Sequence, residues 1–69
     1  MSMYKVVEII GTSTESLEAA ARNAVETAGQ TVRDLRIAEA TRFDVTIENG
    51  KVSSYRVRLD ISFKYEQGD

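Results

Sequence analysis

The stretch LRIAEATRFDVTI, residues 35–47, alternates between two kinds of side chain over its whole length. Most of its odd-numbered residues are large and apolar, and most of its even-numbered residues are charged or small. A period of two is typical of a strand with one buried face. We therefore predict a strand over residues 32–47 whose odd-numbered side chains share one face of a sheet.

A second alternating run covers residues 51–66 and is also apolar at its odd positions, from Tyr55 to Tyr65. The intervening Asn-Gly favours a two-residue hairpin turn. That turn would pair odd-numbered residues of one strand with even-numbered residues of the other. The apolar side chains of the two strands would then lie on opposite faces of the sheet. We therefore expect a three-residue loop with a left-handed Gly50 in a bulge. A bulge further along the strands is the alternative that keeps the two-residue turn.

The first half of the chain predicts one more strand and one helix. Residues 3–10, MYKVVEII, are rich in β-branched residues, and we expect Gly11 to end this strand. Thr12 and Glu15 have the spacing of a capping box at a helix start. A helical apolar stripe then ends before Gly29, a typical C-terminal stop. The stripe consists of Leu17, Ala20, Ala21, Ala24, Val25 and Ala28.

The order β-α-β-β predicts a single α+β domain over residues 1–69. Numbered along the chain, the strands form a three-stranded antiparallel sheet of order 2-3-1, with one helix on one face. Because four of the six stripe residues are alanine, the helix is expected to lie close to the sheet.

The predicted hairpin is much longer than the helix that covers it. Strands of about 15 residues extend over roughly 50 Å, whereas a helix of about 16 residues extends over roughly 24 Å. We expect the uncovered part to be buried by other subunits, because a large exposed apolar surface promotes aggregation. The uncovered side chains are expected to be Phe43, Val45, Ile47, Tyr55 and Val57.

Composition restricts the chemistry of the chain. There is no cysteine and no histidine, so thiolate and imidazole catalysis and disulfides are excluded, and zinc sites nearly so. A net charge of −2 gives no general attraction to nucleic acid or to anionic membranes. No apolar run approaches the length of a membrane span, and the first residues do not read as a signal peptide. We expect a cytoplasmic protein that is not an enzyme, with no nucleic-acid or membrane partner.

Three segments together resemble the dodecin family. They are YKVVEIIGTSTESLEAAARNAV at residues 4–25, the long hairpin, and LDISFKYE at residues 59–66. The most specific part is VEIIGTS followed by the alanine-rich helix. The resemblance implies that the sheet partly wraps the helix and that twelve copies form a hollow homododecamer.

Dodecins are best known for binding flavins, FMN or riboflavin, at subunit interfaces. The resemblance places Ile37 where flavin-binding members carry a stacking aromatic residue, and Arg56 where they carry a glutamine. Asp44 falls near a basic position of some members. Lys5 and Lys64 match positions that face phosphate groups of coenzyme A-type ligands in similar proteins, although two solvated lysines would give the same sequence.

A subgroup with an aliphatic residue at the aromatic position resembles the LRIA run more closely and is associated with calcium. Calcium requires six to eight oxygen ligands. The metal-ligand candidates are Asp34, Glu39, Asp44 and Asp60. They have no D-x-D-x-D spacing, so a site is expected to form between subunits.

Three functions stay open at this point. The leading one is storage or sequestration of a small ligand or ion at interfaces of the shell. The second is flavin binding despite Ile37, and the third is a structural shell with a vestigial pocket. The arginines of the hairpin fit either an anion or nucleotide site or salt bridges between subunits, and they are Arg33, Arg36, Arg42, Arg56 and Arg58.

Overall fold

The computed structural model describes residues 3–65 and contains three strands and one helix. The predicted strand end at residue 66 lies outside this range. The elements, in chain order, are β1 (Met3–Ser13), α1 (Leu17–Ala28), β2 (Leu35–Glu48) and β3 (Lys51–Tyr65).

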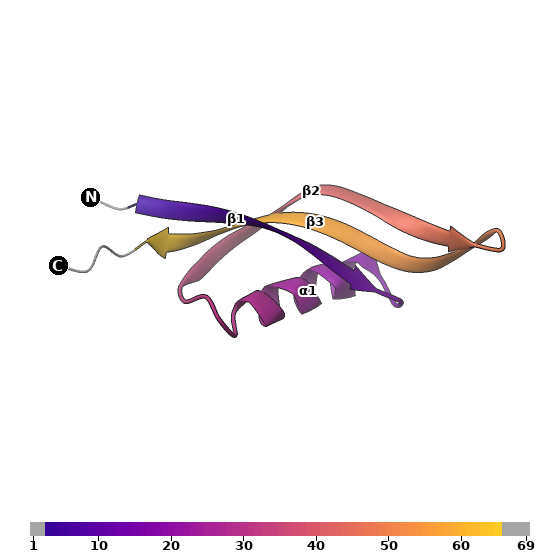
Figure 1. Cartoon of the computed structure of the whole chain (residues 1–69), viewed down its shortest axis with the longest axis horizontal. Coiled ribbons are helices and arrows are strands. Elements are labelled where there is room, and N and C mark those ends of the chain that lie inside the picture. Colours follow the sequence, from indigo (N-terminus) through magenta and orange to yellow (C-terminus); the bar gives the residue numbers. More distant parts are fainter. Residues whose placement is uncertain (1–2, 66–69) are drawn as a thin grey trace.

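The strands form one antiparallel sheet in which β3 lies between β1 and β2, as predicted. The helix α1 covers one face of this sheet, and the β2–β3 hairpin extends well beyond the end of α1 (Figure 1). The molecule is accordingly elongated, with extents of 55 × 20 × 13 Å. Among the described residues, no helix combines the length and the apolar content that crossing a membrane requires.

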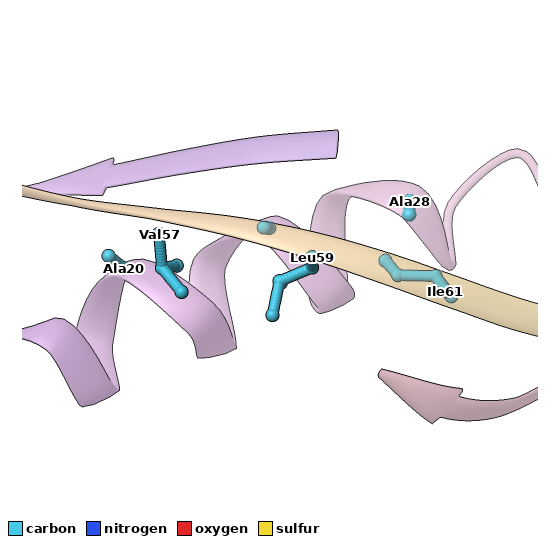
Figure 2. Packing of buried hydrophobic residues seen from close by; sticks show 6 residues of the cluster. Ala20, Ala28, Val57, Leu59 and Ile61 are labelled. Carbon is cyan, nitrogen blue, oxygen red and sulfur yellow. The ribbon is translucent and has the colours of Figure 1, made fainter. Parts of the chain in front are cut away.

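The core lies between α1 and β3. Leu59 and Ile61 are only 2% and 1% exposed, and with Val57 they point from β3 toward Ala20 and Ala28 (Figure 2). Ala20, Ala24 and Ala28 of the predicted apolar stripe are buried and bring the helix backbone close to the sheet. Ala21 and Val25 pack against the core while partly buried, and Ala19, which the predicted stripe did not include, is buried as well.

The helix and the sheet approach each other closely at Gly11. A Cβ atom at this position would lie 2.3 Å from the carbonyl oxygen of Ala20 and 2.7 Å from the Cβ of Ala24. The prediction that Gly11 ends the first strand was therefore wrong. β1 continues through Gly11 to Ser13, and the glycine is a packing site where the strand passes over the helix.

The helix start also differs from the prediction. Thr12 lies within β1, and Ser16 is the residue that caps α1. The Ser16 Oγ accepts a hydrogen bond of 2.9 Å from the backbone N–H of Ala19. The capping box was placed too early because β1 uses three more residues than its apolar run indicates.

We expect Ser16→Ala to lower the free energy of unfolding by about 1 kcal/mol, because an N–H group of the first helical turn loses its acceptor. Urea denaturation at one protein concentration measures this loss. Thr14→Ala, in the exposed loop just before the cap, is the matched control and should change the stability by less than about 0.5 kcal/mol. Equal stabilities for the two variants would contradict the assignment of the cap.

The hairpin turn has two residues, so the predicted three-residue loop was wrong. Glu48 pairs with Lys51 across the turn, and Asn49 and Gly50 both have positive φ angles, 53° and 74°. Positive φ at both central residues is the requirement of a type I′ turn. A bulge at Ser53 then shifts the register by one residue, so that odd-numbered residues of β2 pair with odd-numbered residues of β3 again, as Val45 does with Tyr55. The Ser53 Oγ donates to the Thr46 carbonyl at 3.2 Å.

Two further bulges change which side chains of β2 share a face. The register shifts by one residue at Arg36 and again at Thr41. Ala38 and Ala40 therefore pair with the core residues Ile61 and Leu59. Ile37 lies on the opposite face of the sheet, so the predicted single face of odd-numbered residues was wrong.

The part of the hairpin beyond the helix confirms the predicted overhang for four of its five side chains. Phe43 and Ile47 are each 66% exposed, Val45 is 39% exposed and Tyr55 is half-buried. Val57 was misplaced, because at 4% exposure it belongs to the core under α1.

Candidate functional site

The sheet has a face that α1 does not cover, and we call it the open face. It is formed by the side chains of β3 that alternate with the core residues, together with their cross-strand partners. Directly opposed residues of antiparallel strands lie on the same face, so the register defines rows across the three strands.

The first row contains the pair formed by Arg56 and Asp44. The Arg56 Nε donates to Asp44 Oδ1 at 2.8 Å, and Nη2 donates to Oδ2 at 3.1 Å. This bidentate geometry is the strong form of an arginine–carboxylate contact. The hydrogen bond from Arg56 holds the pKa of Asp44 below its ordinary value of 3.8, helped by the positive charges of Arg56, Arg42 and Arg58.

This pair has a measurable signature. We expect Arg56→Gln to raise the pKa of Asp44 toward 3.8, because the charged donor is lost. Because the pKa of Asp44 is lower in the folded chain than in the unfolded chain, its carboxylate stabilises the fold at pH values above the pKa of the unfolded state. This stabilisation is lost as the pH falls through the pKa of the folded state. Carbon-13 NMR titration of the carboxyl group below pH 5 measures the change, with Arg33→Gln as the control. An Asp44 pKa that does not move would contradict the pair.

The second row is positively charged. Arg42 is the direct partner of Arg58, and Ile10 completes the row from β1. Together with Arg56 and Asp44, these residues line a shallow pocket. Of the hairpin arginines in the sequence prediction, three therefore lie together, whereas Arg33 precedes β2 and Arg36 lies at a bulge.

The third row is negatively charged. Glu39 is the direct partner of Asp60, and Glu8 joins them from β1. Two of the four predicted metal-ligand candidates are thus neighbours. The sequence prediction missed Glu8, because only the register between β1 and β3 places it beside Asp60. That register cannot be read from the spacing of residues in the sequence.

The remaining metal candidates lie elsewhere. Asp44 is engaged by Arg56, and Asp34 precedes β2 with a φ angle of 60°. Within residues 3–65, no group of three carboxylates comes close enough together to hold a metal ion. Within one chain, the described residues therefore present no cluster of three carboxylates for calcium.

Ile37 lies in a fourth row with Ser62 and Val6, and its side chain is 66% exposed. Ser62 and Arg56 are six positions apart on β3, which corresponds to about 20 Å at about 3.3 Å per residue. The two flavin-pocket positions Ile37 and Arg56 thus share the open face of one chain but are too far apart to contact one small ligand.

The two candidate lysines do not share a face. Lys5 pairs with Phe63 on the helix side of the sheet, whereas Lys64 pairs with Tyr4 on the open face. One chain therefore cannot present both lysines to a single phosphate group.

Comparison with known proteins identifies the family. The Dodecin family model matches residues 3–66, which is nearly the whole chain. The chain belongs to the dodecin family. Calcium dodecin from Mycobacterium tuberculosis is 44% identical over 64 residues, covering 93% of this chain and 90% of that protein. Dodecin from Thermus thermophilus is 40% identical over 65 residues, covering 94% of each chain.

Solved dodecin structures have the same fold. Dodecin from Streptomyces coelicolor superimposes with a TM-score of 0.93 at 39% identity, covering 97% of this chain and 96% of the other. The crystal structure of calcium dodecin from M. tuberculosis is described as having a novel calcium-binding site. It superimposes with a TM-score of 0.82 at 42% identity, covering 99% of this chain and 97% of the other. The β-α-β-β order with an antiparallel sheet and one helix is thus the dodecin fold.

Proposed function

We propose that this dodecin is a non-enzymatic protein that forms a homododecameric shell and holds a small ligand or ion at its subunit interfaces. The separation of Ile37 and Arg56 supports this proposal most directly. Both positions face the same side of the sheet, about 20 Å apart along β3. A pocket that uses both positions therefore requires a second copy.

The exposed hairpin supports assembly independently. Phe43, Val45 and Ile47 are apolar and exposed on the helix side of the sheet, beyond the end of α1. The chain has no cysteine for a disulfide. A domain of this size buries only about 60% of its unfolded surface, so burial of the hairpin by neighbouring subunits adds stability that one chain lacks.

Calcium is the ligand that we favour over flavin. Ile37 offers no aromatic face for stacking, and Asp44 engages the guanidinium of Arg56 at the glutamine position. A relative that is 44% identical is named for calcium. Because no three carboxylates of residues 3–65 converge, the calcium ligands would come from more than one subunit.

Native mass spectrometry of the purified protein tests the assembly and the ligand together. We expect a mass of about twelve times the 7.7 kDa chain, with bound calcium that a chelator removes. Chelation should also lower the melting temperature by mass action. A monomer would overturn the shell. A shell without calcium, and with an unchanged melting curve after chelation, would leave flavin binding or a purely structural role.

Flavin binding is tested by a single substitution. We expect Ile37→Trp to tighten riboflavin binding about 2- to 12-fold, because stacking on an aromatic face adds about 0.5–1.5 kcal/mol. Quenching of riboflavin fluorescence measures the affinity. Ile47→Trp adds the same side chain on the other face, near the hairpin turn, and should have no effect. Equal affinities of Ile37→Trp and the unmodified protein would show that the pocket does not accept a flavin.

A further inference from the structure

The turn between β2 and β3 contains the one Asn-Gly pair of the chain, Asn49 followed by Gly50. The side-chain amide of an asparagine can react with the backbone nitrogen of the next residue, because the ring that forms has five members. Glycine obstructs this attack least, since it has no side chain. The turn therefore holds both reacting groups, and their surroundings in the folded chain decide whether they react.

The fold leaves both groups unengaged. Within residues 3–65, the Asn49 side chain makes no hydrogen bond or ion pair, and the backbone N–H of Gly50 has no acceptor. The ladder of the strands ends at the pair Glu48 and Lys51, just outside the turn. Both turn residues are exposed, and a Cβ atom added to Gly50 would meet nothing within 4 Å. The amide carbon, the attacking nitrogen and the approach of water are thus unobstructed.

The turn also lies away from the packed core, at the end of the hairpin beyond α1 (Figure 1). Closure of the ring requires rotation about only two bonds of Asn49, Cα–Cβ and Cα–C. The first rotation moves a free, exposed side chain. The second changes the ψ angle within the turn. A hairpin end without core contacts opens at a much lower free energy than the whole domain, so this change does not require global unfolding.

We propose that Asn49–Gly50 is a self-modification site of the folded protein, at which Asn49 is deamidated without an enzyme. The nitrogen of Gly50 forms a bond to Cγ of Asn49, the Cγ–Nδ2 bond breaks, and ammonia leaves with the proton of Gly50. Water then opens the resulting succinimide ring. The reaction consumes one water molecule, releases one ammonia molecule and involves no oxidation or reduction.

The two ways of opening the ring have different structural consequences. Hydrolysis at Cγ gives aspartate, and hydrolysis at the backbone carbonyl carbon gives isoaspartate, in which the main chain passes through Cβ. Either product adds one negative charge to a chain whose net charge is −2. Asp-Gly is a favoured pair in a type I′ turn, so aspartate keeps the turn. Isoaspartate adds one carbon atom to the main chain and disturbs the pairing of Glu48 with Lys51.

The other asparagine of the chain, Asn23, provides an internal control. Its side chain is also exposed, but the next residue, Ala24, lies within α1 and is only 6% exposed. Backbone N–H groups inside a helix are hydrogen-bonded to carbonyl oxygens one turn earlier. Attack at Asn23 therefore requires opening of the helix and of the core, and folding should protect this asparagine strongly.

The protection that folding provides separates the effect of the structure from the intrinsic reactivity of Asn-Gly. The full-length protein is incubated at mildly alkaline pH and 37 °C, either folded or unfolded in guanidinium chloride, and digested with trypsin at intervals. Asn49 lies in the peptide of residues 43–51, and Asn23 in that of residues 23–33. Chromatography with mass spectrometry measures the amide, aspartate and isoaspartate forms of each peptide. A sample digested at the start corrects for deamidation during digestion.

We expect folding to slow the deamidation of Asn49 by less than about tenfold and that of Asn23 by more than about a hundredfold, because only the second reaction requires opening of the core. Asn49→Gln is the matched variant. It retains an amide but would have to close a six-membered ring, so the acidic form of its peptide should not accumulate.

Two results would overturn the proposal. Equal protection of the two asparagines would show that the turn is shielded, whether by its own rigidity or by a neighbouring subunit. An acidic form that accumulates equally in Asn49→Gln would place the modification at another residue. Neither result depends on the bound ligand or on the number of subunits, so both leave the proposed function of the shell unaffected.

Discussion

Leu59→Ala is expected to lower the free energy of unfolding by about 2–5 kcal/mol, the cost of removing a large side chain from a packed core. Leu59 is 2% exposed and lies in the centre of the cluster between β3 and α1. Small domains have total stabilities of only about 5–15 kcal/mol. The variant is therefore expected to be partly unfolded at 37 °C and to assemble poorly.

Urea denaturation followed by circular dichroism measures this loss, at a fixed protein concentration because assembly contributes to stability. Glu26→Ala, on the exposed side of α1, is the control and should shift the stability by no more than about 0.5 kcal/mol. A Leu59→Ala loss below about 1 kcal/mol would show that β3 does not pack on the helix as described.

Gly11→Ala is expected to be the most damaging addition of a single methyl group, with a loss of about 1–3 kcal/mol. The new Cβ would lie 2.3 Å from the Ala20 carbonyl oxygen and 2.7 Å from the Ala24 Cβ. Both neighbours belong to the helix framework rather than to the end of a flexible side chain. The helix would have to move away from β1, which would also loosen its packing on Leu59.

Gly29→Ala is the matched control for this substitution. Gly29 follows α1 with a φ angle of −66°, and its nearest neighbour would be 3.4 Å from the added Cβ. Alanine fits this conformation and reduces the entropy of the unfolded chain, so the stability should stay equal or rise by about 0.4–1 kcal/mol. Similar losses for the two glycine variants would contradict the close approach at Gly11.

The elements of the fold could be predicted from the sequence because their periods are long and clear. The alanine stripe of α1 and the two alternating runs of the hairpin each extend over several repeats. The order of these elements along the chain then predicted the order of the strands in the sheet. The boundaries were less accurate. The helix cap was assigned to Thr12 instead of Ser16, since β1 continues through a glycine whose role depends on the helix packed beneath it.

The candidate site was predictable only in part. Residue types and family positions pointed to Asp44, Arg56 and Ile37, and the structure places all three on the open face. The bidentate Arg56–Asp44 pair and the neighbouring Arg42–Arg58 row depend on which residues of β2 and β3 are opposite each other. That register includes bulges with no distinctive residue in the sequence, so sequence spacing alone could not reveal the rows.

The sequence by itself determined the order of the elements, the apolar stripe of the helix, the excess length of the hairpin and the dodecin membership. These properties depend on local periodicity and on residue types at fixed spacing. Only the tertiary structure decided that bulges at Arg36 and Thr41 turn Ile37 away from the helix, and that a bulge at Ser53 permits the two-residue turn. The physical reason is that one extra residue in a strand reverses the facing of every side chain beyond it, and cross-strand packing selects where that residue is placed.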